Sequence, residues 1–276
     1  MPFFTEQDLL VMLLIFEKMR TNNYFKFLIF FSLIFSFSFD QVLAEYVGRR
    51  YVDCNLSDCD PKYPKTPTEY YKSNGNALLL QLPGGHGSYQ IFLSSRPISD
   101  LDNKVDVVFL INPYPMPNPN GDPPLRYSPD YVARIKSVIE YYKKLTNKKI
   151  WLSGHSAGTP GIAGFLNGDK NNYKIIDGAV FLSSNYYTRV KVDKINVPIL
   201  ILHHGMDQCK SNKYSGAQIL NNKFLKINSS KTKFVTFSGG KAFGDPCDSP
   251  GGYHFFVGQN DKVANEIINF INENNK

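Results

Sequence analysis

The sequence of 276 residues contains no internal repeat and no low-complexity tract. These absences argue against a repeat array or a disordered chain. Of its residues, 42% are hydrophobic, which suits one globular domain with a sizeable core. We expect that domain to follow an N-terminal appendage.

Concentrated positive charge is also absent, although the net charge is +7 at pH 7. The lysines are scattered among asparagines, and no run of five or six like charges occurs. No basic helix and no interleaving of aromatic with basic residues is found, and these are features of nucleic-acid-binding proteins. Nucleic acid is therefore not an expected partner, and the spread lysines indicate a solvated surface.

The N-terminal apolar segment is too short for a comfortable membrane span. Phe27–Phe39 has 13 residues, follows Arg20 and Lys26, and precedes a small-residue cleavage site that ends at Ala44. This arrangement is typical of a secretory signal peptide. The alternative is an uncleaved anchor.

We therefore predict a signal peptide over residues 19–44 and a single secreted or periplasmic domain over residues 45–276. Met19 stands where such a peptide begins, so residues 1–18 are interpreted as an over-extended N-terminus. No cysteine directly follows Ala44, which argues against a lipoprotein. After cleavage no stable membrane anchor is expected.

Cysteine is scarce, and all four residues lie in the predicted mature domain: Cys54, Cys59, Cys209 and Cys247. An even number in an exported chain predicts two disulfides. Of the three possible connectivities we favour Cys54–Cys59 with Cys209–Cys247. The alternative is a zinc site, but the spacings match no metal pattern well. Neither a metal nor a cofactor is expected.

Short apolar runs alternate with helical patterns along the rest of the chain. The expected strands are Asn76–Leu82, Val105–Ile111, Ile150–Leu152, Gly178–Ser183, Val197–His203 and Lys233–Phe237, and the expected helices are Ser128–Leu145, Thr159–Leu166, Ser215–Leu225 and a last one around Val263–Ile271. Solid apolar strands between helices predict an α/β fold with a mostly parallel sheet covered on both faces. The earlier stretch Glu45–Lys72 lacks clean periodicity and is interpreted as a wrapped arm, within which a short hairpin stays open.

The most informative stretch is Gly154–Gly158, which reads Gly-His-Ser-Ala-Gly between an expected strand and an expected helix. A Gly-x-Ser-x-Gly at such a junction is the signature of a nucleophile elbow. The turn is tight, so glycines are needed where the neighbouring strand and helix approach. Ser156 would then stand at the positive end of the helix, with the Ala157 N–H facing a developing oxyanion.

The order of these features resembles the α/β-hydrolase superfamily. Along this chain the features are, in order, a strand, the loop Pro83–Gly87 (Pro-Gly-Gly-His-Gly), the elbow, Asp207 and then His254. The chain is most similar to small exported bacterial hydrolases of the dienelactone-hydrolase-like kind, from about Asn76 to Asn272. The resemblance implies an α/β-hydrolase fold and a Ser-His-Asp triad in the usual chain order.

The resemblance implies a role for each member of the triad. Ser156 would attack the substrate, His254 would carry the proton, and Asp207 would orient the imidazole. Asp207 just follows the expected strand Val197–His203, where the family places its acid. Asp245 and Asp248 are rivals for that position, but both lie in the same loop as His254.

The remaining histidines receive different interpretations. His86 lies in the loop that resembles the family's oxyanion loop, where the backbone N–H of Gly85 or His86 would be the second donor. His155 occupies a variable position of the elbow motif and is expected to be structural. His203 and His204 end a strand beside the acid, and a metal pair there is the less favoured interpretation.

The pocket walls are predicted from what lies between the strands. Ser184–Asn196 is too short for a sizeable lid, so we expect an open cleft that favours small or polar esters. The expected lining residues are Tyr114, Met116, Tyr186 and Tyr187.

The sequence thus predicts a secreted serine hydrolase, most consistent with a carboxylic ester hydrolase that forms an acyl-enzyme. Its expected partner is a small-molecule ester or acyl substrate. Two alternatives stay open: an acyltransferase or peptidase with the same triad, and a non-catalytic ligand-binding protein of the same fold.

Overall fold

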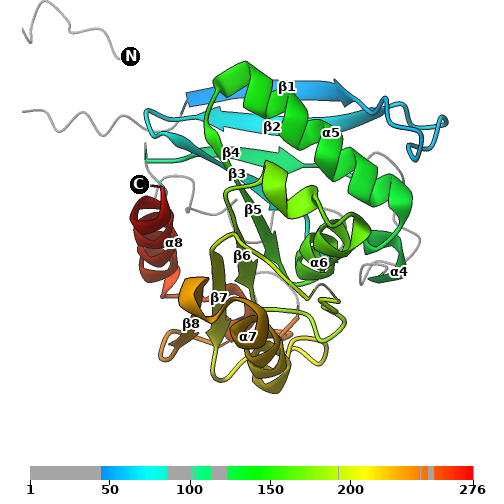
Figure 1. Ribbon diagram of the computed structural model, residues 1–276. Coiled ribbons are helices and arrows are strands. Elements are labelled where there is room, and N and C mark those ends of the chain that lie inside the picture. Colours follow the sequence, from blue (N-terminus) through cyan, green and yellow to red (C-terminus); the bar gives the residue numbers. More distant parts are fainter. Residues whose placement is uncertain are drawn as a thin grey trace, which may run out of the picture. The chain divides into compact units, whose positions relative to one another are not determined.

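One eight-stranded sheet organises the described part of the chain, in the order β1-β2-β4-β3-β5-β6-β7-β8 (Figure 1). The computed structural model describes residues 45–85, 101, 104–112, 123–191, 193–242, 244–247 and 252–275. The strands are β1 (Glu45–Asp53), β2 (Lys65–Lys72), β3 (Ala77–Leu82), β4 (Asp106–Leu110), β5 (Lys149–His155), β6 (Gly178–Leu182), β7 (Ile199–His204) and β8 (Thr232–Phe237). From β4 to β8 in that order all neighbours are parallel, while β1 and β2 are antiparallel additions at one edge.

Helices cover both faces of the sheet, as the sequence predicted. They are α4 (Pro123–Arg126), α5 (Pro129–Thr146), α6 (Gly158–Gly168), α7 (Tyr214–Asn228) and α8 (Asn260–Asn274), with short 3-10 turns η2 (Asn172–Ile175), η3 (Ser229–Lys231) and η4 (Gly252–Phe255). In Figure 1 the helices α5, α6 and α7 lie on one side of the sheet and α8 on the other.

Alternation along the buried strands divides the apolar side chains between two cores. In β5, Ile150 and Leu152 pack with the residues of α5 and α6, whereas Trp151 packs with those of α8. β3 behaves in the same way, with Leu78 and Leu80 on the first face and Leu79 on the second. Because both faces are covered, these strands have the continuous apolar sequence from which they were predicted.

Glu45–Lys72 is not a wrapped arm, and the hairpin that the sequence left open in this stretch is present. β1 and β2 form an antiparallel hairpin of nine and eight residues that extends the sheet past β4. The inward positions of β2 are Thr66, Thr68 and Tyr70, all buried. Buried threonine and tyrosine do not produce an apolar alternation, so the strand was hidden from a hydrophobicity pattern.

The parallel strands bring three loops to one edge of the sheet. β5 ends at His155, β6 at Leu182 and β7 at His204, and the carboxyl ends of parallel strands share an edge.

The part of the chain that the structure describes holds no helix long and apolar enough to cross a membrane. The predicted signal peptide lies outside the described residues.

Candidate active site

Ser156 lies in a strained turn between β5 and α6. Its φ is 54°, in the left-handed region that non-glycine residues rarely adopt. A Cβ on Gly154 would lie 2.6 Å from the Gly158 carbonyl oxygen, and one on Gly158 would lie 2.6 Å from the Leu82 carbonyl oxygen. Both glycines are therefore required for close backbone approach, and the turn has the form expected of a nucleophile elbow.

Backbone hydrogen bonds hold the elbow in place. The Ser156 N–H donates to the Leu182 carbonyl at 3.0 Å, and the Ser156 carbonyl accepts from Thr159 Oγ1 at 2.7 Å. Within the described residues no hydrogen bond joins Ser156 Oγ to the His254 ring. Nucleophile–base bonds are often long before substrate binds. The Ser156 side chain is half-buried and free of competing partners in that part of the chain.

Asp207 and His254 form a buried acid–base pair. His254 Nδ1 lies 2.8 Å from Asp207 Oδ2, and the two residues are 2% and 7% exposed. An ionised carboxylate only accepts hydrogen bonds, so the proton is on Nδ1. The other ring nitrogen, Nε2, is therefore left with a lone pair that can take a proton from a nucleophile.

One further hydrogen bond fixes the Asp207 carboxylate, and a neutral histidine lies beside it. The Cys209 N–H donates to Asp207 Oδ1 at 2.9 Å, and His203 Nε2 lies 3.5 Å from Oδ2. Burial is the main cause that lowers the pKa of His203 to about 4, so this ring is neutral near pH 7. Asp207 thus accepts hydrogen bonds from one amide and one imidazole, while the neutral His203 ring lies close by and donates to the Asn212 carbonyl instead.

The backbone of His254 is held by two side chains, His155, which was expected to be structural, and Ser183, to which sequence reasoning gave no role. His155 Nε2 donates to the His254 carbonyl at 2.9 Å, and Ser183 Oγ donates to the same oxygen at 2.8 Å. Burial lowers the pKa of His155 well below its usual value, with the nearby His254 as a second cause, so His155 is a neutral donor. His155, the residue before Ser156, therefore ties the turn after β5 to the loop that carries His254.

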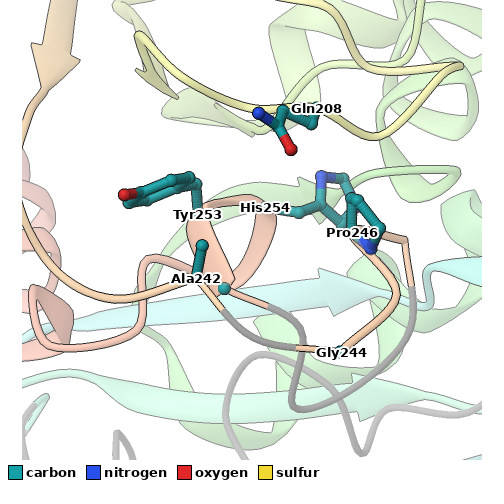
Figure 2. A pocket seen from close by; sticks show the side chains of 7 residues that line it. Gln208, Ala242, Gly244, Pro246, Tyr253 and His254 are labelled. Atoms are coloured by element: carbon teal, nitrogen blue, oxygen red, sulfur yellow. The ribbon is translucent and has the colours of Figure 1, made fainter.

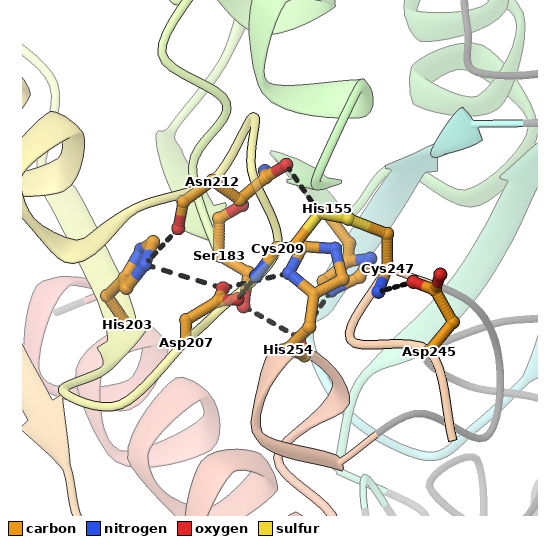
Figure 3. Close-up of a disulfide and its surroundings, with 9 residues drawn as sticks. All are labelled: His155, Ser183, His203, Asp207, Cys209, Asn212, Asp245, Cys247 and His254. Atoms are coloured by element: carbon orange, nitrogen blue, oxygen red, sulfur yellow. Dashed lines mark hydrogen bonds and ion pairs between the residues drawn. A yellow bond between two sulfur atoms is a disulfide. The ribbon is translucent and has the colours of Figure 1, made fainter. Parts of the chain in front are cut away.

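A disulfide lies beside the acid–base pair (Figure 3). It joins Cys209, two residues after Asp207, to Cys247, with a Cα–Cα distance of 4.7 Å. A second disulfide joins Cys54 to Cys59, in the connection between β1 and β2. These are the two pairings favoured from the sequence.

Of the two rival acids, only Asp245 lies in the described residues. Its Oδ1 accepts a hydrogen bond from the Cys247 N–H at 2.8 Å, so its carboxylate shapes its own exposed turn. Asp207, rather than Asp245, contacts His254. Asp248 lies outside the described residues.

A small pocket of about 40 Å³ adjoins His254 (Figure 2). Its lining residues are Gln208, Ala242, Gly244, Pro246, Gly252, Tyr253 and His254. The loops of the acid and the base thus meet around it, while Ser156 is not among the lining residues. As lined by the described residues, the pocket admits water but is too small for a whole substrate.

Two backbone N–H groups near Ser156 are candidates for an oxyanion hole. Ala157 caps the N-terminus of α6, where backbone N–H groups have no partner within the helix. A Cβ built on Gly84 would lie 3.9 Å from Ser156 Cβ, so the loop that carries Gly85 lies against the elbow. His86, the other proposed donor, lies outside the described residues.

The predicted wall residues are only partly described. Tyr186 and Tyr187 are 42% and 40% exposed, and their ring centroids are 3.9 Å apart. They follow β6 and lie near α6, because the Asn185 N–H in the same loop donates to Thr159 Oγ1. Tyr114 and Met116 lie outside the described residues.

His203 and His204 do not face a common ligand. His203 Nδ1 accepts from the Ser184 N–H, and its Nε2 donates to the Asn212 carbonyl. His204 is likewise bonded through both ring nitrogens to backbone groups. Among the described residues no group of three or more potential metal ligands is found.

Neither a protein-family model nor a curated protein matches the sequence. Solved structures do match its fold. Est1E from Butyrivibrio proteoclasticus aligns with a TM-score of 0.53 at 16% identity, over 82% of this chain and 98% of that one. A lidless α/β serine hydrolase from Xanthomonas campestris aligns with a TM-score of 0.53 at 9% identity, over 83% and 94%.

Dienelactone hydrolase from Anabaena variabilis aligns with a TM-score of 0.56 at 11% identity, over 84% of this chain and 99% of that one. These identities are low, so the likeness concerns the fold. The chain has the α/β-hydrolase fold. Consistent with a lidless form, the described residues between β6 and β7 contain no helix.

Proposed function

We propose that the protein is a serine hydrolase that cleaves carboxylic esters through an acyl-enzyme. Ser156 is the nucleophile, His254 the general base and then general acid, and Asp207 the group that orients His254. The observation that carries this proposal is the pairing of a strained serine after β5 with a buried Asp207–His254 bond of 2.8 Å at the same sheet edge.

The reaction follows from these roles. Ser156 Oγ attacks the ester carbonyl carbon while His254 Nε2 takes its proton, and the carbonyl electrons move onto oxygen. The oxyanion is bound by the N–H groups of Ala157 and Gly85. Collapse breaks the ester bond, His254 protonates the leaving alcohol, and water then hydrolyses the acyl-enzyme by the same route.

The substrate class follows from the surroundings of the elbow. The absence of a helix in the described residues between β6 and β7 supports an open site for small or polar esters. The exposed rings of Tyr186 and Tyr187 offer a surface on which an aromatic acyl group can stack. Est1E has been solved with ferulic acid bound. Esters of aromatic acids therefore belong in the substrate panel.

Export is part of the proposal. Two disulfides support an oxidising compartment, either secreted or periplasmic. The predicted signal peptide places the mature N-terminus at Glu45. Intact-mass analysis of the exported protein tests this assignment, and an uncut chain in the membrane fraction would contradict it.

Covalent labelling tests the mechanism directly. A fluorophosphonate probe should modify the mature protein at Ser156, as located by peptide mapping, and should leave Ser156→Ala unmodified. A panel of esters, thioesters and amides then separates an esterase from a peptidase. Absence of labelling in the folded wild-type protein would favour a non-catalytic ligand-binding protein.

A further inference from the structure

Arg126, at the end of α4, is a fully buried arginine that has no ion pair with a carboxylate in the described part of the chain. Its Nη1 donates to the Tyr131 hydroxyl, and its Nη2 donates to the Gly84 carbonyl at 2.8 Å. Its Nε finds no partner among the described residues. A buried charge with only neutral partners is unfavourable for stability, so its place beside Gly84 calls for a functional explanation.

The residue that Arg126 contacts belongs to the loop beside the nucleophile. A Cβ built on Gly84 would lie 3.4 Å from the His155 carbonyl oxygen as well as close to Ser156. The Gly84 carbonyl and the Gly85 N–H belong to one planar peptide, in which they point in opposite directions. When Arg126 holds that carbonyl, it also determines where the Gly85 N–H points.

We propose that Arg126 is a positioning residue for the oxyanion hole. By binding the Gly84 carbonyl it turns the Gly85 N–H away from α4 and toward the oxygen of the substrate at Ser156. The guanidinium also adds a positive charge, unpaired with any carboxylate of the described residues, one peptide away from the developing oxyanion, in surroundings that screen it weakly. This inference rests on the proposed function and adds a residue to it.

The same buried cluster packs tightly against the helix of the nucleophile. A Cβ on Gly164 would lie 2.4 Å from the Arg126 carbonyl oxygen, and one on Gly161 would lie 2.9 Å from Tyr131 Cε1. Both glycines are in α6, whose first N–H groups include the other oxyanion donor. Arg126 thus contacts both elements of the proposed oxyanion hole: the Gly84–Gly85 peptide through its side chain, and α6 through its backbone.

Direct binding of a substrate carboxylate by Arg126 fits the structure less well. The side chain is 0% exposed, and both of its terminal nitrogens are bonded to protein groups. A substrate-binding arginine would change KM, whereas an oxyanion-positioning arginine changes transition-state binding. The two roles therefore differ in steady-state kinetics.

Kinetics of Arg126→Met and Arg126→Lys test the proposal on an activated short ester. We expect Arg126→Met to lower kcat about 100-fold with KM within about twofold, as expected for loss of one oxyanion donor. Arg126→Lys keeps a charged donor and should recover kcat to within about tenfold of wild type. Retained kcat in folded Arg126→Met, or a change confined to KM, would overturn the proposal.

A trifluoromethyl ketone inhibitor supplies a readout that a structural role would not change. Ser156 adds to the ketone carbon, its proton passes to His254, and the carbonyl oxygen becomes an oxyanion in the hole. The inhibition constant should rise about 100-fold in Arg126→Met, in parallel with the fall in kcat. An unchanged inhibition constant would contradict the role in the hole.

Arg134→Met is the matched control. Arg134 is also a buried arginine, in α5, but its Nη2 bonds Asp130 at 2.8 Å. We expect this variant to lose thermal stability while kcat and the inhibition constant stay within about twofold of wild type. A loss of kcat equal to that of Arg126→Met would mean that any damaged arginine impairs the enzyme, and would overturn the proposal.

If Arg126→Met does not fold, Arg126→Lys and Arg126→Gln carry the same comparison of kcat with the inhibition constant.

Two further outcomes separate this inference from the proposed function. If Ser156→Ala retains the activity of wild type, the proposed function fails and this inference fails with it. If activity depends on Ser156 but not on Arg126, only the inference fails.

Discussion

At the scale of single residues, the proposed chemistry depends on three side chains with unequal roles. Ser156→Ala and His254→Ala should each lower turnover of an activated short ester about a million-fold, because the nucleophile and base act as a unit. Asp207→Asn should lower it about ten-thousand-fold. Steady-state kinetics with each purified variant give the measurement.

A serine far from the site provides the control for these substitutions. Ser57 is exposed in the turn between the cysteines of the first disulfide. Ser57→Ala should keep full turnover. Substantial turnover by Ser156→Ala, after contamination is excluded by active-site titration, would show that the nucleophile has been assigned to the wrong residue.

His203 makes folding sensitive to acid. Burial lowers its pKa to about 4, whereas the unfolded chain has the ordinary value of 6.5. Between these pH values the unfolded state binds a proton that the folded state does not, so stability falls as pH decreases. On going from pH 7 to 4, the free energy of unfolding should therefore fall by about 3 kcal/mol through His203 alone.

Urea unfolding of wild type and His203→Gln at several pH values measures this contribution. Gln keeps an acceptor and a donor but has no titrating group, so His203→Gln should be less stable near pH 7 and should lose less stability on acidification. His155 is expected to contribute to the remaining slope in both proteins, because burial lowers its pKa too. Parallel stability curves would contradict the assignment to His203.

At the scale of elements, two opposite effects on stability meet at Gly158, in the turn from β5 to α6: helix propensity favours alanine there, and close backbone contact excludes it. Gly158 begins α6, and replacing a helical glycine by alanine normally stabilises a protein by about 1 kcal/mol. A Cβ at this position would lie 2.6 Å from the Leu82 carbonyl oxygen, which is backbone and cannot move aside easily. Gly158→Ala should therefore destabilise the fold by about 2 kcal/mol or more and lower turnover strongly.

Gly216 in α7 is the matched control, because a Cβ there would meet only Tyr186 atoms at 3.5 Å and beyond. Gly216→Ala should raise the free energy of unfolding by about 0.5 to 1 kcal/mol with little effect on turnover. Thermal and urea unfolding compare the two variants. If Gly158→Ala is as stable as Gly216→Ala, Gly158 does not approach the Leu82 carbonyl at the end of β3 as closely as described.

The parts of the site that follow buried strands could be predicted from the sequence. Ser156 directly follows β5 and Asp207 lies just past the end of β7, and a parallel sheet brings such strand ends together. The contacts of His155 with His254 and of Arg126 with Gly84 join residues 99 and 42 positions apart. No local pattern records such pairs, so the partners required the structure, although His155 had been expected to be structural.

The edge hairpin shows the same limit for the fold. β2 was only left open as part of a hairpin because its inward side is Thr66, Thr68 and Tyr70, whereas β3 was predicted because all six of its residues are buried and mostly apolar. Hydrophobicity detects strands with two covered faces more readily than strands at an edge. The mostly parallel centre was therefore predictable, and its antiparallel extension was not.

At the scale of the whole molecule, the two disulfides lie at opposite edges of the sheet. Cys54–Cys59 closes the connection between β1 and β2 at one edge. Cys209–Cys247 joins the loops that follow β7 and β8 at the other edge, where Asp207 and His254 lie. This separation allows one bond to be removed without disturbing the surroundings of the other.

The chain-entropy model gives the two bonds different effects on stability. Closing a loop with a sequence separation of 38 contributes about 4 kcal/mol, and closing one of 5 contributes about 2 kcal/mol. Cys209→Ser with Cys247→Ser should therefore lower the unfolding free energy more than Cys54→Ser with Cys59→Ser. Urea unfolding of the two double variants measures this difference.

The effects on turnover should differ still more, because only one of the bonds lies beside the acid and the base. Cys209 N–H itself donates to the Asp207 carboxylate, so loss of its disulfide loosens a direct contact of the proposed triad. A displacement of about 1 Å there can reduce the rate about 100-fold. Cys209→Ser with Cys247→Ser should show that loss at temperatures where the protein stays folded, while Cys54→Ser with Cys59→Ser keeps nearly full turnover. Equal turnover in both double variants would mean that the acid and base loops are held by their hydrogen bonds alone.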